Sequence, residues 1–73
     1  MAKSIYYISN NGKSTLENNS ETNTSPITCL TKLTNTSTVT AYITDNITLT
    51  GEHEFNNITF IGKAQTNRPY IQS

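Results

Sequence analysis

The residue types best suited to chemistry form one short cluster in this chain, Glu52-His53-Glu54. Carboxylates and an imidazole can bind metals and can also act in general acid–base catalysis. In an extended segment, neighbouring side chains point to opposite sides, so Glu52 and Glu54 share a side that excludes His53. A metal held by all three would need further ligands from elsewhere, and the pattern favours a solvated turn.

A second motif, Gly12-Lys13-Ser14-Thr15, reproduces the end of a phosphate-binding loop and follows a predicted strand. That loop needs an earlier glycine so that backbone N–H groups can surround the phosphates, and Tyr7 occupies this position. Residues 16–19 form a poor helix, which removes the dipole that would help to bind phosphate. We therefore predict an Asn-Gly turn with an exposed lysine and no nucleotide cofactor.

The remaining reactive groups are isolated in the sequence. Cys29 is the only cysteine, so no internal disulfide can form, and we expect it to be a small buried hydrophobic side chain. A Cys, Ser or Thr nucleophile needs a positioned base, and the only His lies far along the chain. Nothing pairs the carboxylates as glycoside hydrolysis requires, because all lie in predicted loops or turns: Glu17, Glu21, Asp45, Glu52 and Glu54. We predict no catalytic residue, no metal site and no cofactor within these residues, and hence no enzyme.

Two further patterns concern glycans. Five asparagines fit the acceptor pattern Asn-x-Ser/Thr: Asn18, Asn23, Asn35, Asn46 and Asn57. Asn and Thr are so frequent here that several such matches arise by chance. Four tyrosines would stack on sugar rings if the fold displayed them together: Tyr6, Tyr7, Tyr42 and Tyr70. Core packing or scattered surface positions are the expectation for them.

The composition sets wider limits on the function. The chain has 73 residues, enough for one domain at most, and apolar residues make up 33% of it. Five basic residues balance five acidic ones, so there is no electrostatic reason to expect nucleic acid or an anionic membrane as a partner. No apolar run approaches the roughly 20 residues of a membrane span. The apolar patch after Lys3 is too short for a signal peptide, so we expect a cytosolic chain or a piece of a longer exported one.

The elements that would position these residues are mostly strands. Apolar and polar residues alternate with a period of two in residues 39–44, 47–50 and 58–61, which predicts three half-buried strands. Asn, Asp and Gly residues separate them, as turns require. Residues 4–8 predict another strand that ends at an Asn-Gly turn, and Tyr70-Ile71 predicts the start of a last one.

A loop and a helix are expected before the strand series. Residues 13–24 are polar and lack periodicity, which predicts an exposed loop. Ser25 is a suitable N-cap and Pro26 suits the first position of a helix. Ile27, Leu30 and Leu33 then recur at three-residue steps and form one apolar face. The many threonines give this helix a weak propensity, so packing must hold it.

The order of these elements resembles the N-terminal entry of right-handed parallel β-helix proteins, the pectin-lyase-like group. The matching segments are Tyr7–Gly12, Ser25–Leu33 and Asn57–Gly62, the last being the sharpest match. Within that group the chain looks most like adhesin-like and polymorphic-outer-membrane-type surface proteins. It departs from them because it lacks their Gly-Gly-Ala-Ile repeat, and Phe55-Asn56-Asn57 only approaches their Phe-x-x-Asn repeat.

The resemblance implies a mainly β fold that begins a right-handed parallel β-helix behind a short N-terminal capping helix. It divides residues 1–73 into a strand, loop and capping helix (1–37) and the first coils (38–73), and it implies an extracellular or cell-surface location. A small open β-sheet domain is the alternative fold. One coil of a solenoid cannot bury its own apolar face, and about three or more are normally needed.

Three functions remain open at this point. The first is a non-catalytic structural and interaction segment of an adhesin-like surface protein, with protein or glycan surfaces as its partners. The second is the N-terminal fragment of a β-helix polysaccharide lyase or hydrolase. The third is a small intracellular β-protein that self-associates through a strand edge, because open edges pair readily with other chains.

Overall fold

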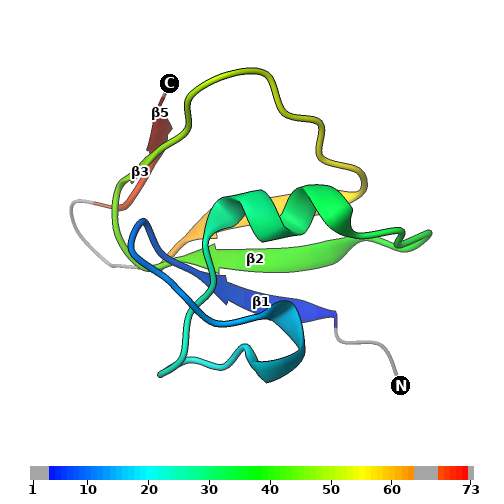
Figure 1. Ribbon diagram of the computed structural model, residues 1–73, viewed down its shortest axis with the longest axis horizontal. Helices are drawn as coiled ribbons and strands as arrows, with labels where there is room; N and C mark the ends of the chain where they lie inside the picture. The colour runs from blue at the N-terminus through cyan, green and yellow to red at the C-terminus, as the bar shows by residue number, and fades with distance from the viewer. Residues whose placement is uncertain (1–3, 64–67, 73) are drawn as a thin grey trace.

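The computed structural model describes residues 4–63 and 68–72, which form a mainly β structure with short 3-10 helices (Figure 1). The predicted mainly β class is therefore confirmed. The strands are β1 (Ile5–Ile8), β2 (Val39–Ile43), β3 (Ile47–Thr48), β4 (Ile58–Gly62) and β5 (Ile71–Gln72). The helices are η1 (Leu16–Asn18) and η2 (Ile27–Lys32).

Both sheets are parallel. The larger one has the order β1-β2-β4, so its strands lie side by side in the order in which the chain forms them. Tyr7 is opposite Tyr42, and Tyr42 is opposite Ile61. After β2 and again after β4 the chain passes to the second sheet, where β3 pairs with β5 and Ile47 is opposite Ile71. Parallel pairs need crossover connections, and the long loops of this chain supply them.

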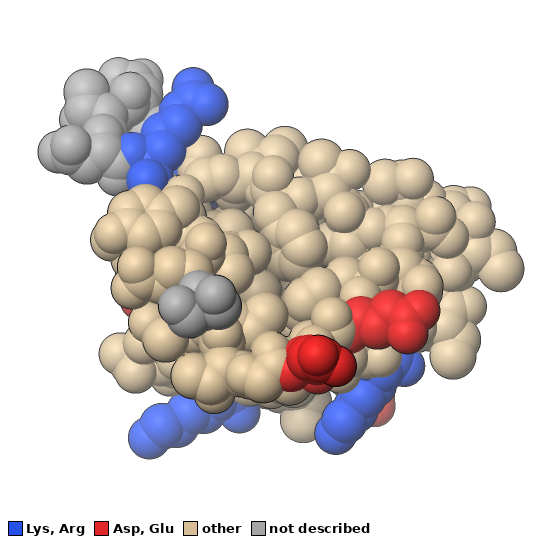
Figure 2. Space-filling model, turned by 90° about the horizontal axis from the view of Figure 1, so that it is seen from above, with Lys and Arg blue, Asp and Glu red and all other residues tan. Residues whose placement is uncertain are grey.

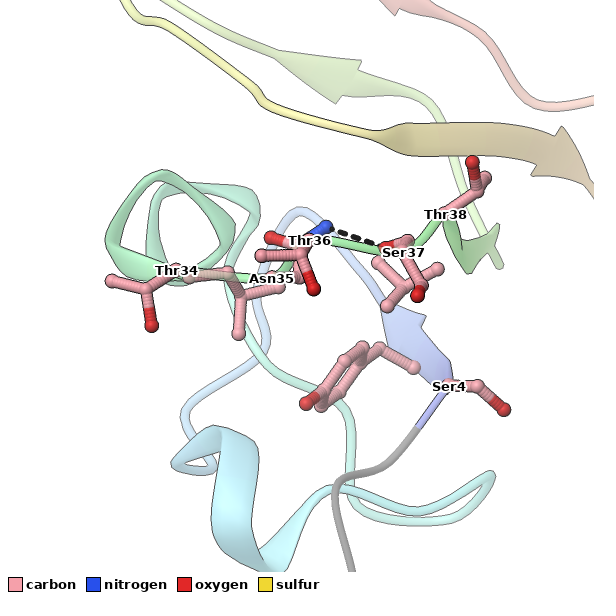
Figure 3. A pocket seen from close by; sticks show the side chains of 9 residues that line it. Ser4, Thr34, Asn35, Thr36, Ser37 and Thr38 are labelled. Atoms are coloured by element: carbon pink, nitrogen blue, oxygen red, sulfur yellow. Dashed lines mark hydrogen bonds between the residues drawn. The ribbon is translucent and has the colours of Figure 1, made fainter.

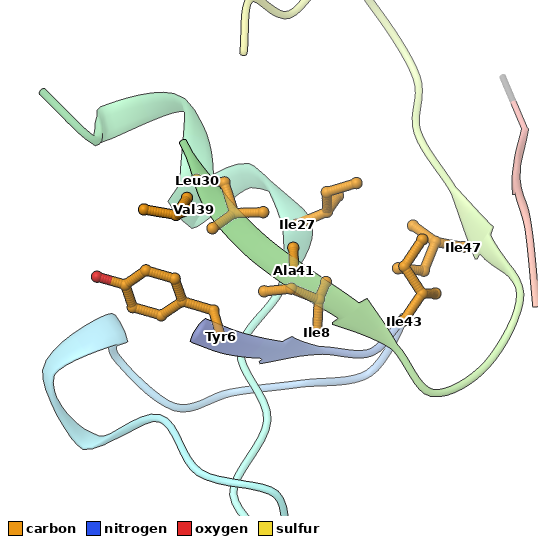
Figure 4. Packing of buried hydrophobic residues seen from close by; sticks show 8 residues of the cluster. All are labelled: Tyr6, Ile8, Ile27, Leu30, Val39, Ala41, Ile43 and Ile47. Carbon is orange, nitrogen blue, oxygen red and sulfur yellow. The ribbon is translucent and has the colours of Figure 1, made fainter. Parts of the chain in front are cut away.

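The core lies between η2 and the larger sheet (Figure 4). The alternation in β2 has the predicted effect, because Val39, Ala41 and Ile43 are 5%, 0% and 3% exposed. Both halves of the chain contribute to this single cluster, whose other buried members are Tyr6, Ile8, Ile27, Leu30 and Ile47. The strands predicted over residues 39–44 and 58–61 are confirmed, whereas β3 stops at Thr48 and leaves Leu49 half-buried.

The helix predicted after Ser25 forms, but its capping was predicted wrongly. η2 is a 3-10 helix, and Pro26 holds the capping position without a side-chain hydrogen bond. The three-residue spacing of Ile27 and Leu30 suits the three residues per turn of a 3-10 helix, and both side chains are buried. Ser25 is fully buried and bonds elsewhere, as described below.

The loop predicted over residues 13–24 is also more ordered than expected. Thr15 caps η1 by accepting a hydrogen bond from the Asn18 N–H at 3.4 Å. Asn19, which directly follows η1, is only 6% exposed. The predicted turn residues behave as expected at Gly51 and Asn57, whose φ angles of 84° and 56° lie in the left-handed region that glycine and asparagine tolerate.

Candidate functional site

The outer edge of β1 is closed by a side-chain amide. The Tyr7 N–H donates to Asn19 Oδ1 at 2.7 Å, and Asn19 Nδ2 donates to the Tyr7 carbonyl at 2.6 Å. These two bonds satisfy the backbone donor and acceptor that a neighbouring strand would otherwise use. The amide of Asn19 therefore takes the place of a strand residue at this edge.

Ser25 completes the closure from the same side. Its backbone N–H donates to the Tyr7 carbonyl at 3.1 Å, and its carbonyl accepts from the Ser9 N–H at 3.1 Å. Its hydroxyl accepts from Asn19 Nδ2 at 2.8 Å, which fixes the amide in place. Gly12 allows the loop to approach, because a Cβ there would lie 2.5 Å from the Ser25 carbonyl carbon. Together, Asn19 and Ser25 form what we call the closed edge.

The outer edge of β4 has no such cover in the described part of the chain. On its inner side, the Asn57 carbonyl accepts from Val39 and the Lys63 N–H donates to Ile43. Because the groups of a strand face alternate sides, the N–H and C=O groups of Ile58, Phe60 and Gly62 point away from β2. No strand among residues 4–63 and 68–72 pairs with that side of β4, which we call the open edge.

The burial of the inward side chains also differs between β2 and β4. Ile58 and Phe60 point inward but are only half-buried, whereas Val39 and Ala41, the residues opposite them in β2, are buried. An edge-to-face contact with Phe55, with ring centroids 5.4 Å apart, covers part of Phe60. The inward apolar side chains of β4 are therefore partly exposed, whereas those of β2 are buried.

A shallow pocket of about 450 Å³ opens near the first residues of β1 and β2 (Figure 3). Its lining carries many hydroxyls and no charged side chain: Ser4, Tyr6, Leu33, Thr34, Asn35, Thr36, Ser37, Thr38 and Val39. Asn35 Nδ2 donates to the carbonyls of Ser37, Asn56 and Asn57 at 2.9–3.1 Å. These bonds hold the start of β4 against the loop before β2, so the best-connected residue of the pocket positions the open edge.

The motifs suited to chemistry lie apart from one another. His53 Nε2 lies 2.8 Å from the Thr50 carbonyl, and Glu52, His53 and Glu54 are all exposed. No group of three potential metal ligands occurs among the described residues. Lys13 is exposed, as predicted, and its backbone N–H donates to Thr24. Cys29 is a free thiol and is half-buried, so it is less enclosed than predicted.

The tyrosines separate into different surroundings. Tyr6 is in the core, Tyr70 is 53% exposed, and Tyr7 stacks on Tyr42 with ring centroids 5.6 Å apart. Lys63 Nζ lies 5.0 Å from the Tyr7 ring centroid and forms an ion pair with Glu21.

The hydrogen bond of that ion pair, and then its charge attraction, lowers the pKa of Glu21. The same hydrogen bond raises the pKa of Lys63. Elsewhere charge is sparse: Figure 2 shows a face on which the few charged side chains lie around a broad uncharged surface. These contacts fasten the end of β4 to the N-terminal loop.

Comparison with known protein families, with curated proteins and with solved structures found no match for this chain. None of the helices in the described residues is long and apolar enough to cross a membrane. The sequence does not indicate that Asn19 or Ser25 closes a strand edge, because Ser25 matches a helix N-cap instead. Asn19 was placed in an exposed loop, and nothing in its neighbours signals that its amide would pair with a strand twelve residues earlier.

Proposed function

We propose that this chain is a non-catalytic structural and interaction segment, the N-terminal end of a right-handed parallel β-helix of the adhesin-like kind. Its role is to terminate the β-helix on one side and to receive the next coil on the other. The contrast between the closed edge of β1 and the open edge of β4 carries this proposal.

The path of the chain supports the β-helix. The strands of the larger sheet stack in chain order, and two successive passes continue into the second sheet. Connections between parallel strands of one sheet are right-handed in nearly all proteins. Inward residues alternate with outward ones in the same register on all three strands, as coils stacked on one another require.

The incomplete burial of the inward side chains of β4 supports the presence of a further coil. A neighbouring strand on β4 would cover Ile58 and Phe60, which are half-buried, and would pair with the three backbone positions that face outward. A small self-associating β-protein could use the same open edge to pair with other copies. The concentration dependence of the melting temperature distinguishes a chain that associates in this way from a self-sufficient monomer.

The test is a thermal melt of the purified chain followed by far-UV circular dichroism at two well-separated concentrations. We expect a β-type melt whose midpoint rises with concentration, because chains that pair through the open edge stabilise one another. A cooperative melt that is independent of concentration would mean a self-sufficient monomer and would contradict the proposal.

A further inference from the structure

The open edge of one copy of this chain would be a partner for β1 of a second copy, if the closed edge did not already occupy β1. Through their common neighbour β2, β1 and β4 share one register, in which Ile5 corresponds to Thr59 and Tyr7 to Ile61. A second copy could therefore place its β1 on β4 with every inward residue still pointing inward. Zero net charge offers no electrostatic repulsion against such stacking.

Such stacking is head-to-tail, and head-to-tail contacts that do not close into a ring produce open filaments. Only the closed edge stands in the way. The outward backbone groups along this edge belong to Ile5 and Tyr7 of β1 and to Ser9, which directly follows the strand. Asn19 and Ser25 already bind those of Tyr7 and the N–H of Ser9. A docking strand would find outward groups only at Ile5, too few for a stable pair.

We propose that Asn19 prevents filament growth in two ways: its amide occupies the backbone of Tyr7, and its hydrogen bond to the Ser25 hydroxyl holds the Ser25 backbone against this edge, so that a second copy cannot add its β4 to β1. The inference rests on the open edge of the proposed function and extends it to the choice of partner. Closure of β1 limits association of the native chain to a two-fold pair of open edges, while the next coil of the same protein remains free to bind β4.

Hydrogen exchange of the native chain tests the closure without any substitution. At a concentration too low for open edges to pair, we expect the Tyr7 amide to exchange at least about tenfold more slowly than the Phe60 amide, because the first is bonded to Asn19 and the second faces outward. Equal exchange rates at the two positions would overturn the inference.

Association of the Asn19→Ala variant tests the consequence. Sedimentation velocity and electron microscopy should show filaments for Asn19→Ala, and no species beyond a dimer for the native chain or for the matched control Asn18→Ala. A synthetic Asn19→Ala chain with an N-methylated Phe60 amide should lose the filaments, because the methyl group blocks the open edge. A folded Asn19→Ala chain of native size, or filaments that survive N-methylation, would overturn the inference.

The melting experiment keeps this inference separate from the proposed function. Filaments of Asn19→Ala together with a native melt independent of concentration would remove the proposed function and support the role of Asn19. A native melting temperature that rises with concentration, together with an Asn19→Ala chain of native size, would support the proposed function and overturn the role of Asn19.

Discussion

The two edges of the larger sheet are built from similar strands and end differently. β1 is bordered by Asn19 and Ser25, which bind its outward backbone groups, whereas no described strand pairs with the outward groups of β4. The apolar residues follow the same division, because Ile8 is fully buried and Ile58 is half-buried. The three-stranded sheet thus has a closed edge at β1 and an open edge at β4, where another strand could pair.

The largest effect on the free energy of unfolding is expected from substitutions of inward apolar residues near the two edges. Ile8→Ala should cost about 2–5 kcal/mol of unfolding free energy because it leaves a cavity in a closed core. Ile58→Ala should cost about 1–2 kcal/mol, since less of its side chain is buried. Urea unfolding of both variants at one fixed protein concentration measures the two losses. A larger loss at Ile58 than at Ile8 would mean that β4 is not an open layer.

The closed edge itself should be the next most sensitive feature. Asn19→Ala leaves the Tyr7 N–H without its partner and should cost about 1–3 kcal/mol. Asn18→Ala, at an exposed neighbouring position, should change the unfolding free energy by less than about 0.5 kcal/mol. Parallel urea titrations at a concentration below that at which filaments form compare the pair, and similar losses for both variants would show that the amide of Asn19 does not hold the edge.

Two glycines test the same difference through packing. Gly12→Ala should cost about 1–3 kcal/mol, because its Cβ would meet the Ser25 backbone at 2.5–2.6 Å. Gly51→Ala, in the loop before β4, meets only the end of a flexible His53 side chain and should cost about 1 kcal/mol for its positive φ. Thermal melts of the two variants rank them, and the reverse order would contradict close packing at the closed edge.

The smallest effect is expected from the exposed ion pair that links the end of β4 to the N-terminal loop. Because Lys63 lowers the pKa of Glu21 in the folded chain, the stabilisation is present above the ordinary pKa of 4.5 and is lost as the pH falls through the lower folded value. Glu21→Gln should remove this slight acid dependence from the melting temperature, and added salt should weaken it in the native chain. An acid dependence that Glu21→Gln leaves unchanged would assign it to another group.

The sequence predicts the strands better than it predicts the edges. The period of two in residues 39–44 identified β2 because each inward residue there is buried by its neighbours. Ser25 was predicted as a helix cap because local preference is the only information its neighbours carry, but its hydroxyl instead binds Asn19. The role of Asn19 depends on a contact with a strand twelve residues away, and such contacts have no local signature.

The measurement that tests the central claim most directly is a series of ¹H–¹⁵N spectra of the native chain over a wide range of concentrations. If β4 is the open edge, the amide signals of Ile58, Phe60 and Gly62 should shift as the concentration rises. The signals of Tyr7 and Ser9 at the closed edge should stay in place. Shifts at Tyr7 and Ser9, with none along β4, would contradict the assignment of the two edges.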